Sequence, residues 1–153
     1  MTDTSYDTDV YAWTVAQAAH LRAMKWNALD IDHLAEEIEA LGNEQRHAVE
    51  SQLRMLLMHL LQWAYQPGRR RRSWLSSSTN ARAEIEARLR RSPTLRRELP
   101  DFLSWAYPKA CRAAADETGR PRASFPQTCP WTLEQLLDDD FLPERMEEYE
   151  SRT

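Results

Sequence analysis

Three polar side chains have the residue types and the spacing for acid–base or ligand-binding chemistry. At about 100° per residue along a helix, Glu37, His59 and Arg82 each fall at or near the apolar face of a predicted helix. A charge in such a position needs a partner, because its unpaired burial is costly or shifts its pKa. A carboxylate, an imidazole and a guanidinium can satisfy one another. We therefore expect at least two of the three within hydrogen-bonding or salt-bridge distance, with Gln66 on the same side as His59.

This predicted polar cluster has two interpretations. A closed network, shielded from solvent, would fix the register of the helices, and His59→Ala would then lower stability. A functional site would instead open into a concave pocket, as in a ligand-binding protein or an enzyme. We favour the structural interpretation. The sequence contains no phosphate-binding loop, nucleophile elbow, Rossmann fingerprint or Cys–His dyad.

A run of arginines followed by a tryptophan forms a candidate contact loop. Its residues are Arg69, Arg70, Arg71, Arg72 and Trp74, and this mixture of charge and aromatic ring is typical of nucleic-acid contacts. Against that interpretation, the net charge of the chain is −4, and no helix-turn-helix or zinc-finger motif is visible. We therefore expect a solvated loop, or one that pairs with the protein's own acidic ends, rather than a nucleic-acid partner.

Charge is unevenly distributed along the chain. Residues 1–50 carry three basic and ten acidic side chains, residues 51–122 fifteen and six, and residues 123–153 two and eight. A basic middle between acidic ends can close on itself or bind a second copy. If such pairs join two copies, salt should dissociate them, because exposed charges are screened within about 10 Å. An oligomer unaffected by salt would point to an apolar interface instead.

Metal and cofactor sites have little support. His33 with Glu37, and Glu44 with His47, each lie within one helical turn, so either pair could hold one ion. A di-iron bundle needs Glu-x-x-His on two helices and two further glutamates, and only Glu44 and His47 have that order. We predict no metal site and no cofactor.

The composition predicts an all-α protein that forms a single domain over residues 1–153. The chain has three Gly, three Ile and three Val, few for a β-rich fold, and strong helix formers dominate. No run approaches the roughly 18 apolar residues of a membrane span, and the polar, acidic start is unlike a signal peptide. We therefore expect a cytoplasmic protein without membrane contact, with Cys111 and Cys129 as free thiols.

Periodicity and end signals predict one compact bundle of about six or seven helices. The helices with clear bounds cover residues 9–26, 30–41, 43–66, 74–91, 100–118 and 133–137, and a further short one opens at Ser92-Pro93. Gly42 is expected to end the second helix in the left-handed conformation. The sixth is expected to end at Thr118, before Gly119, and Thr132 and Gln135 are expected to form a capping box for the last short helix. The acidic tail, about residues 144–153, is expected to fray.

Apolar spacing indicates which faces are buried. Leu34, Ile38 and Leu41 define the expected buried face of the second helix. The long third helix is apolar on both sides in its second half, which places it at the centre of the bundle. The irregular segment 119–131 is expected to be pinned by Phe125 and Trp131.

Several motifs in fixed order resemble a family signature. They are YDTDVYAWT at 6–14, LAEEIEALG at 34–42, HLLQWAYQP at 59–67, RSW at 72–74, SPTL at 92–95, ETG at 117–119 and FPQTCPWTLEQLLDDDFLP at 125–143. Together they resemble domain-of-unknown-function family 29, a group of bacterial helical proteins, over nearly the whole chain. Gln62 stands where the family typically has Lys, a small departure. The resemblance implies a bacterial source and a helical fold, and it supplies no activity or site residue.

The sequence thus predicts a non-enzymatic helical module that binds an unknown protein partner or associates with itself as a homo-oligomer. The first alternative is a ligand-binding protein or enzyme built around Glu37, His59 and Arg82. The second is nucleic-acid binding through the arginine loop at residues 69–72.

Overall fold

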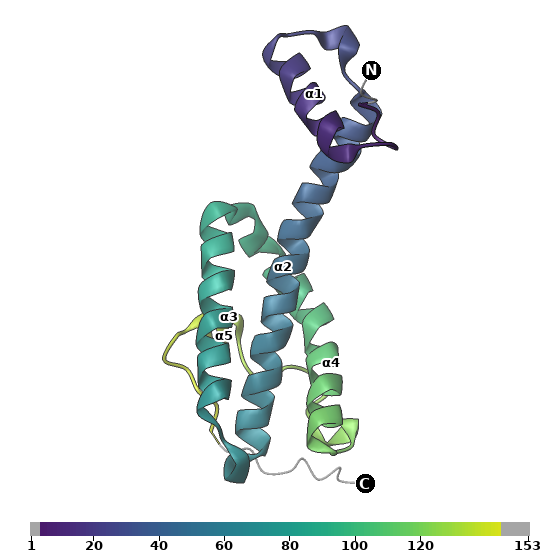
Figure 1. The fold of residues 1–153 in the computed structure, drawn as a ribbon. Coiled ribbons are helices and arrows are strands. Elements are labelled where there is room, and N and C mark those ends of the chain that lie inside the picture. Colours follow the sequence, from purple (N-terminus) through teal and green to yellow (C-terminus); the bar gives the residue numbers. More distant parts are fainter. Residues whose placement is uncertain (1–3, 145–153) are drawn as a thin grey trace. The chain divides into compact units, whose positions relative to one another are not determined.

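The computed structural model describes residues 4–144 and contains five α-helices and no strand within that range (Figure 1). The helices are α1 (Val10–Arg22), α2 (Ile31–Tyr65), α3 (Arg72–Arg91), α4 (Leu99–Thr118) and α5 (Leu133–Leu137). Short 3-10 helices lie in the connections between them: η1 (Trp26–Ala28), η2 (Pro67–Arg69), η3 (Pro93–Glu98) and η4 (Arg122–Ser124). The all-α class is confirmed, with slightly fewer helices than predicted. No helix in the described range is long and apolar enough to cross a membrane.

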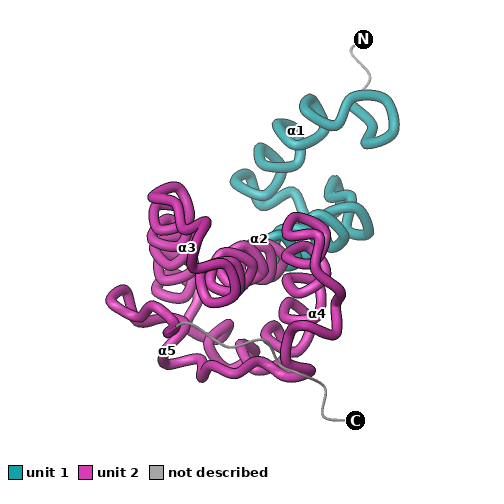
Figure 2. Tube along the Cα trace, turned by 90° about the horizontal axis from the view of Figure 1, so that it is seen from below, with its two compact units in different colours: residues 1–44 teal, residues 45–153 magenta. Residues whose placement is uncertain are grey.

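The chain separates into two compact units, residues 1–44 and residues 45–153 (Figure 2). Each is described by itself. The expected single domain over residues 1–153 stays a prediction. The expected frayed tail lies outside the described residues, apart from Glu144.

The predicted break at Gly42 is wrong, because α2 continues through it as one helix of 35 residues. Glycine inside a helix costs about 1 kcal/mol relative to alanine. Strong helix formers on both sides, with no proline among them, outweigh that cost. The predicted end of α4 at Thr118 is confirmed, and Gly119 follows it with a left-handed φ of 68°.

The second unit contains the hydrophobic core. Its α2 segment lies between α3 and α4 (Figures 1 and 2), and Leu61 and Tyr65 on the far side of α2 are as buried as the main stripe, which confirms the central position. Phe125 and Trp131 are buried in the same core, so the irregular segment is pinned as predicted. The expected capping box of Thr132 and Gln135 opens α5.

The first unit is a hairpin of α1 and the beginning of α2. Asp9 caps α1 with its side chain, and α1 ends at Arg22, earlier than predicted. Met24 has a positive φ of 56°. The amide of Lys25 donates to the His20 carbonyl at 2.9 Å, and the amide of Met24 donates to the Leu21 carbonyl at 3.1 Å. This pair of hydrogen bonds is typical of a helix that ends in a left-handed residue.

The expected buried face of the hairpin is wrong. Ile38 is 65% exposed and Leu41 is 61% exposed. Within the described residues 4–44, Trp13 is the one buried apolar side chain. Spacing alone correctly identified an apolar stripe, but nothing in this unit covers it.

Candidate functional site

The structure gives the residues of the predicted polar cluster separate partners. Glu37, in the first unit, accepts a hydrogen bond from the Tyr6 hydroxyl. In the second unit His59 pairs with Gln62 at 3.0 Å, and Arg82 donates to backbone carbonyls. His59 and Arg82 are not joined to each other, and the expected pairing of either with Glu37 stays a prediction. Partners close by in the fold satisfy each side chain first.

Arg82 clamps the end of α5 and the turn after it. Its Nε donates to the Leu136 carbonyl at 2.8 Å, and its Nη2 donates to the Phe141 carbonyl at 2.9 Å. The last carbonyls of a helix have no partner within it, so the guanidinium supplies one. The side chain is 3% exposed, and burial lowers its pKa against the opposing effect of Asp139. This role is structural.

A buried glutamine connects two elements of the second unit. The Gln62 carbonyl oxygen pairs with Nδ1 of His59, and its amide nitrogen donates to the Glu117 carboxylate at 2.5 Å. An amide oxygen can only accept, so Nδ1 of His59 carries the proton. Gln66 lies half-buried one turn further on, and its carbonyl accepts from the Arg69 amide.

The arginine loop is exposed. Arg69, Arg70, Arg71 and Arg72 all face solvent, whereas Trp74 is half-buried. Arg70 stacks on the Trp63 ring at 4.6 Å and donates to the Trp63 carbonyl, so the aromatic partner of this loop comes from α2. Nucleic-acid binding here stays a prediction.

Sequence reasoning missed a cluster in the first unit centred on Asp30. Its carboxylate accepts from the Trp13 indole at 3.0 Å and from Nδ1 of His33 at 2.7 Å, and its own amide donates to Gln17 at 2.8 Å. The bond with His33 lowers the pKa of Asp30 below 3.8 and raises the pKa of His33 above 6.5. The signal was present: Asp30 precedes α2, where a helix cap is expected.

Tyr6 completes this Asp30 cluster. Its ring stacks on His33 at 4.0 Å between centroids and meets Trp13 edge-on at 5.0 Å. A carboxylate only accepts hydrogen bonds, so Nδ1 of His33 carries the proton and Nε2 is the basic position. The cluster can therefore hold and release one proton while it joins α1 to α2.

The possible metal ligands and the two cysteines bear on metal and thiol chemistry. Within residues 4–144 no group of three or more His, Cys, Asp or Glu side chains is arranged to hold a metal ion. Cys111 and Cys129 are free thiols, as predicted. Burial raises the pKa of both, that of Cys129 to about 11. Since the thiolate is the nucleophile, neither is activated at neutral pH.

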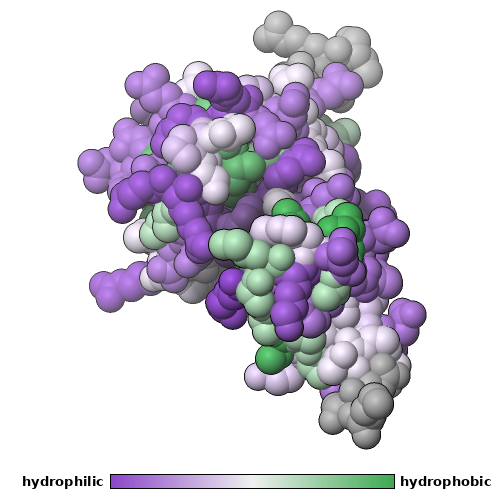
Figure 3. All heavy atoms as spheres, turned by 90° about the horizontal axis from the view of Figure 1, so that it is seen from above, coloured by the Kyte–Doolittle hydropathy of each residue, from purple (hydrophilic) through white to green (hydrophobic). Residues whose placement is uncertain are grey.

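The first unit exposes most of the large apolar side chains that reach the surface. Nine of the twelve in the described chain belong to it, and only Met55, Trp105 and Leu142 belong to the second unit. Such residues appear between polar ones in the space-filling view (Figure 3). We call the nine the N-terminal apolar surface: Val10, Tyr11, Val15, Leu21, Met24, Trp26, Ile31, Ile38 and Leu41.

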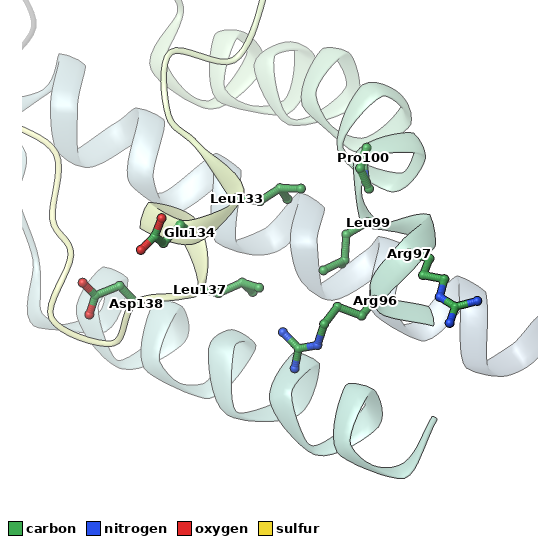
Figure 4. A pocket seen from close by; sticks show the side chains of 8 residues that line it. All are labelled: Arg96, Arg97, Leu99, Pro100, Leu133, Glu134, Leu137 and Asp138. Atoms are coloured by element: carbon green, nitrogen blue, oxygen red, sulfur yellow. The ribbon is translucent and has the colours of Figure 1, made fainter. Parts of the chain in front are cut away.

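A shallow groove of about 530 Å³ in the second unit runs between η3, the start of α4, and α5. Leu99, Leu133 and Leu137 point toward one another across it, whereas Glu134 points away (Figure 4). The groove has an apolar floor, and the residues at its rim carry both signs of charge.

The family model described as "Domain of unknown function DUF29" matches residues 5–142. The match covers most of the sequence, so the chain belongs to this family, as its motifs predicted. No curated protein and no solved structure matches the chain. The family therefore accounts for the ordered motifs and brings no activity with it.

Proposed function

We propose that this protein is a non-enzymatic protein-interaction module whose docking site is the N-terminal apolar surface. The observation that carries the proposal is the concentration of exposed apolar side chains on residues 10–41. A gathering of exposed apolar side chains on one short unit is typical of a surface that binds another protein. Tyr11, Met24 and Trp26 are of the types enriched in interface cores.

The rival functions have less support. Arg82 and His59 already have partners of their own, which favours a structural role for them over a ligand or acid–base site with Glu37. The arginine loop is accessible to nucleic acid, but a nearby Trp ring already stacks on one of its side chains. The bacterial, cytoplasmic setting belongs to this proposal as an expectation.

The test is a photo-cross-linking residue placed at Trp26 in the full chain, in the cells of its natural source. Trp26 is 61% exposed, so the substitution leaves the hairpin intact. We expect one cross-linked species, identified by mass spectrometry, that is absent when the label replaces Arg90. Arg90 is also exposed, on α3 of the second unit. No product at position 26, or the same products at both positions, would contradict the proposal.

A further inference from the structure

We propose that the partner seated on this surface is a second copy of the chain, paired through one stripe of α2. This inference rests on the proposed function and adds the identity of the partner. Ile31 and Ile38 are separated by seven residues, and Leu34 and Leu41 follow each of them by three. Apolar residues that alternate three and four apart form the seam of paired helices. We call the stripe the α2 seam: Ile31, Leu34, Ala35, Ile38, Leu41 and Gly42.

The α2 seam is uncovered within its own unit. α1 lies against another side of the helix, where Tyr6 contacts His33 and Glu37 and where Trp13 reaches Asp30 (Figure 1). All members of the seam are exposed except Leu34, which is half-buried. A neighbouring helix can therefore approach without displacing α1.

Gly42 supplies an independent observation. It lies inside α2 in helical conformation, and a Cβ added there would meet no atom within 4 Å. Nothing among the described residues therefore requires glycine there, although glycine lowers helix stability relative to alanine. Like Ala35 two turns earlier on the same stripe, Gly42 carries no large side chain, so a second backbone can come close, and the isoleucines and leucines of an identical stripe can pack there.

The seam selects for its own sequence rather than for a charged partner. The first unit carries two basic and nine acidic residues, but the exposed carboxylates of its part of α2, those of Asp32, Glu36, Glu39 and Glu44, lie outside the seam. A basic partner attracted by them would leave the seam uncovered. In a two-fold pair the same patch forms the interface on both copies, so each apolar residue of the seam is buried once in each copy.

The exposed area is sufficient for a stable dimer. At roughly 100 Å² for each exposed large side chain, the N-terminal apolar surface offers on the order of 1,000 Å² per copy. A specific interface of standard size uses about 800 Å² per partner. The α2 seam contributes three of these nine side chains, so an interface of that size also buries apolar neighbours on α1.

Sedimentation of the purified full chain tests the inference, with two neutral variants matched in side chain. Ile38→Gln changes the seam, and Ala40→Gln changes an exposed position on the opposite side of α2. We expect a wild-type dimer that Ile38→Gln weakens by roughly a hundredfold, about tenfold for each copy's lost isoleucine, and that Ala40→Gln leaves unchanged. Because Ile38 is 65% exposed, circular dichroism should show equal helix content in both variants.

Salt and Gly42 sharpen the test. We expect added salt to leave the dimer intact, because an apolar seam is not screened, whereas pairing between the arginine segment and an acidic end would dissociate. Gly42→Ala should weaken the dimer although it favours the helix. A dimer that salt dissociates, or that tolerates Ile38→Gln or Gly42→Ala, would overturn the seam.

A wild-type chain that stays monomeric at all concentrations would overturn the second copy as partner. It would leave the proposed function standing if the cross-linked species at Trp26 contains a different protein. If no cross-link forms, the proposed function fails as well. The two failures are therefore distinguishable.

Discussion

The two units of this chain differ in the interactions that stabilise each of them internally. The second unit closes around one apolar core that extends from Val49 to Leu136. Among its described residues, the first unit buries one apolar side chain, Trp13, and relies on the hydrogen bonds of Asp30 and the stacked rings of Tyr6 and His33. One region thus draws its stability from burial and the other from a small polar and aromatic cluster.

This difference indicates what each unit requires. Chains below about 40 residues rarely bury enough surface to fold alone, and the first unit is close to that limit. Its exposed apolar side chains resemble those of a core, but nothing within the unit covers them. A unit of this kind becomes stable when a second surface covers it, which is why we assign the docking site to it.

The largest expected effect is the loss of the Arg82 clamp in the second unit. Arg82→Met keeps the volume of the side chain but leaves the carbonyls of Leu136 and Phe141 without their donor. Unsatisfied buried groups with a charged former partner cost about 3 kcal/mol. We expect urea unfolding of the second unit to shift by that amount.

The matched control for this clamp is Arg90→Met on the same helix. Arg90 is exposed, so its replacement should change stability by less than about 0.5 kcal/mol. Equal effects of the two substitutions would contradict a specific clamp. If Arg82→Met also increased hydrogen exchange at the amides of α1, the first unit would depend on the core of the second, and the two units would not be stabilised separately.

A second prediction concerns the first unit. Asp30→Ala removes the acceptor of the Trp13 indole and of the His33 ring, so α1 should detach while the second unit stays folded. Native-state hydrogen exchange should show faster exchange in residues 10–22 and unchanged exchange in α4. Asp32→Ala, an exposed neighbour, is the control, and protection that survives Asp30→Ala would refute this role of the cluster.

The pH dependence of the first unit follows from the same pair. The folded pKa of His33 is raised, so its contribution is complete below the unfolded value near 6.5 and is lost as pH rises through the folded value. The folded pKa of Asp30 is lowered, so its contribution is complete above about 3.8 and is lost as pH falls through the folded value. Glu36 and Asp7 act in the same direction on His33.

The protection factors of α1 should therefore be highest between these two limits and should fall above neutral pH. In His33→Gln the decline above neutral pH should disappear. A decline of equal size in α4 would show that the effect is not local to the hairpin.

Local signals in the sequence predicted much of the fold. The end of α4 at Thr118, the capping box of Thr132 and Gln135, and the two-sided apolar pattern of α2 each depend on a few adjacent residues, and each is confirmed. The prediction of a helix end at Gly42 was wrong, because a helix end depends on the neighbouring residues as well as on one glycine. Apolar spacing predicted a buried face at Ile38, but spacing indicates only that the face is apolar.

The candidate site was harder to predict for a related reason. Helical phase places a polar side chain on a face but does not say which of several partners it reaches first. Arg82 found backbone carbonyls that no side-chain pattern reveals. The Asp30 cluster depends on how α1 returns along α2, and the sequence shows no repeat or spacing that joins Tyr6 and Trp13 to His33.

The smallest expected effect compares two tyrosine hydroxyls, one in each unit. The Tyr65 hydroxyl is buried without a hydrogen-bond partner in the described chain, while its ring packs edge-on against Phe125 at 5.0 Å. Tyr65→Phe keeps that contact and removes an unsatisfied group, so the second unit should gain up to about 1 kcal/mol in urea unfolding. Tyr6→Phe should instead loosen the hairpin, because the hydroxyl is bonded to Glu37, and exchange in residues 10–22 should rise. Destabilisation of the second unit by Tyr65→Phe would mean that its hydroxyl has a partner such as an ordered water, and the contrast between the two tyrosines would fail.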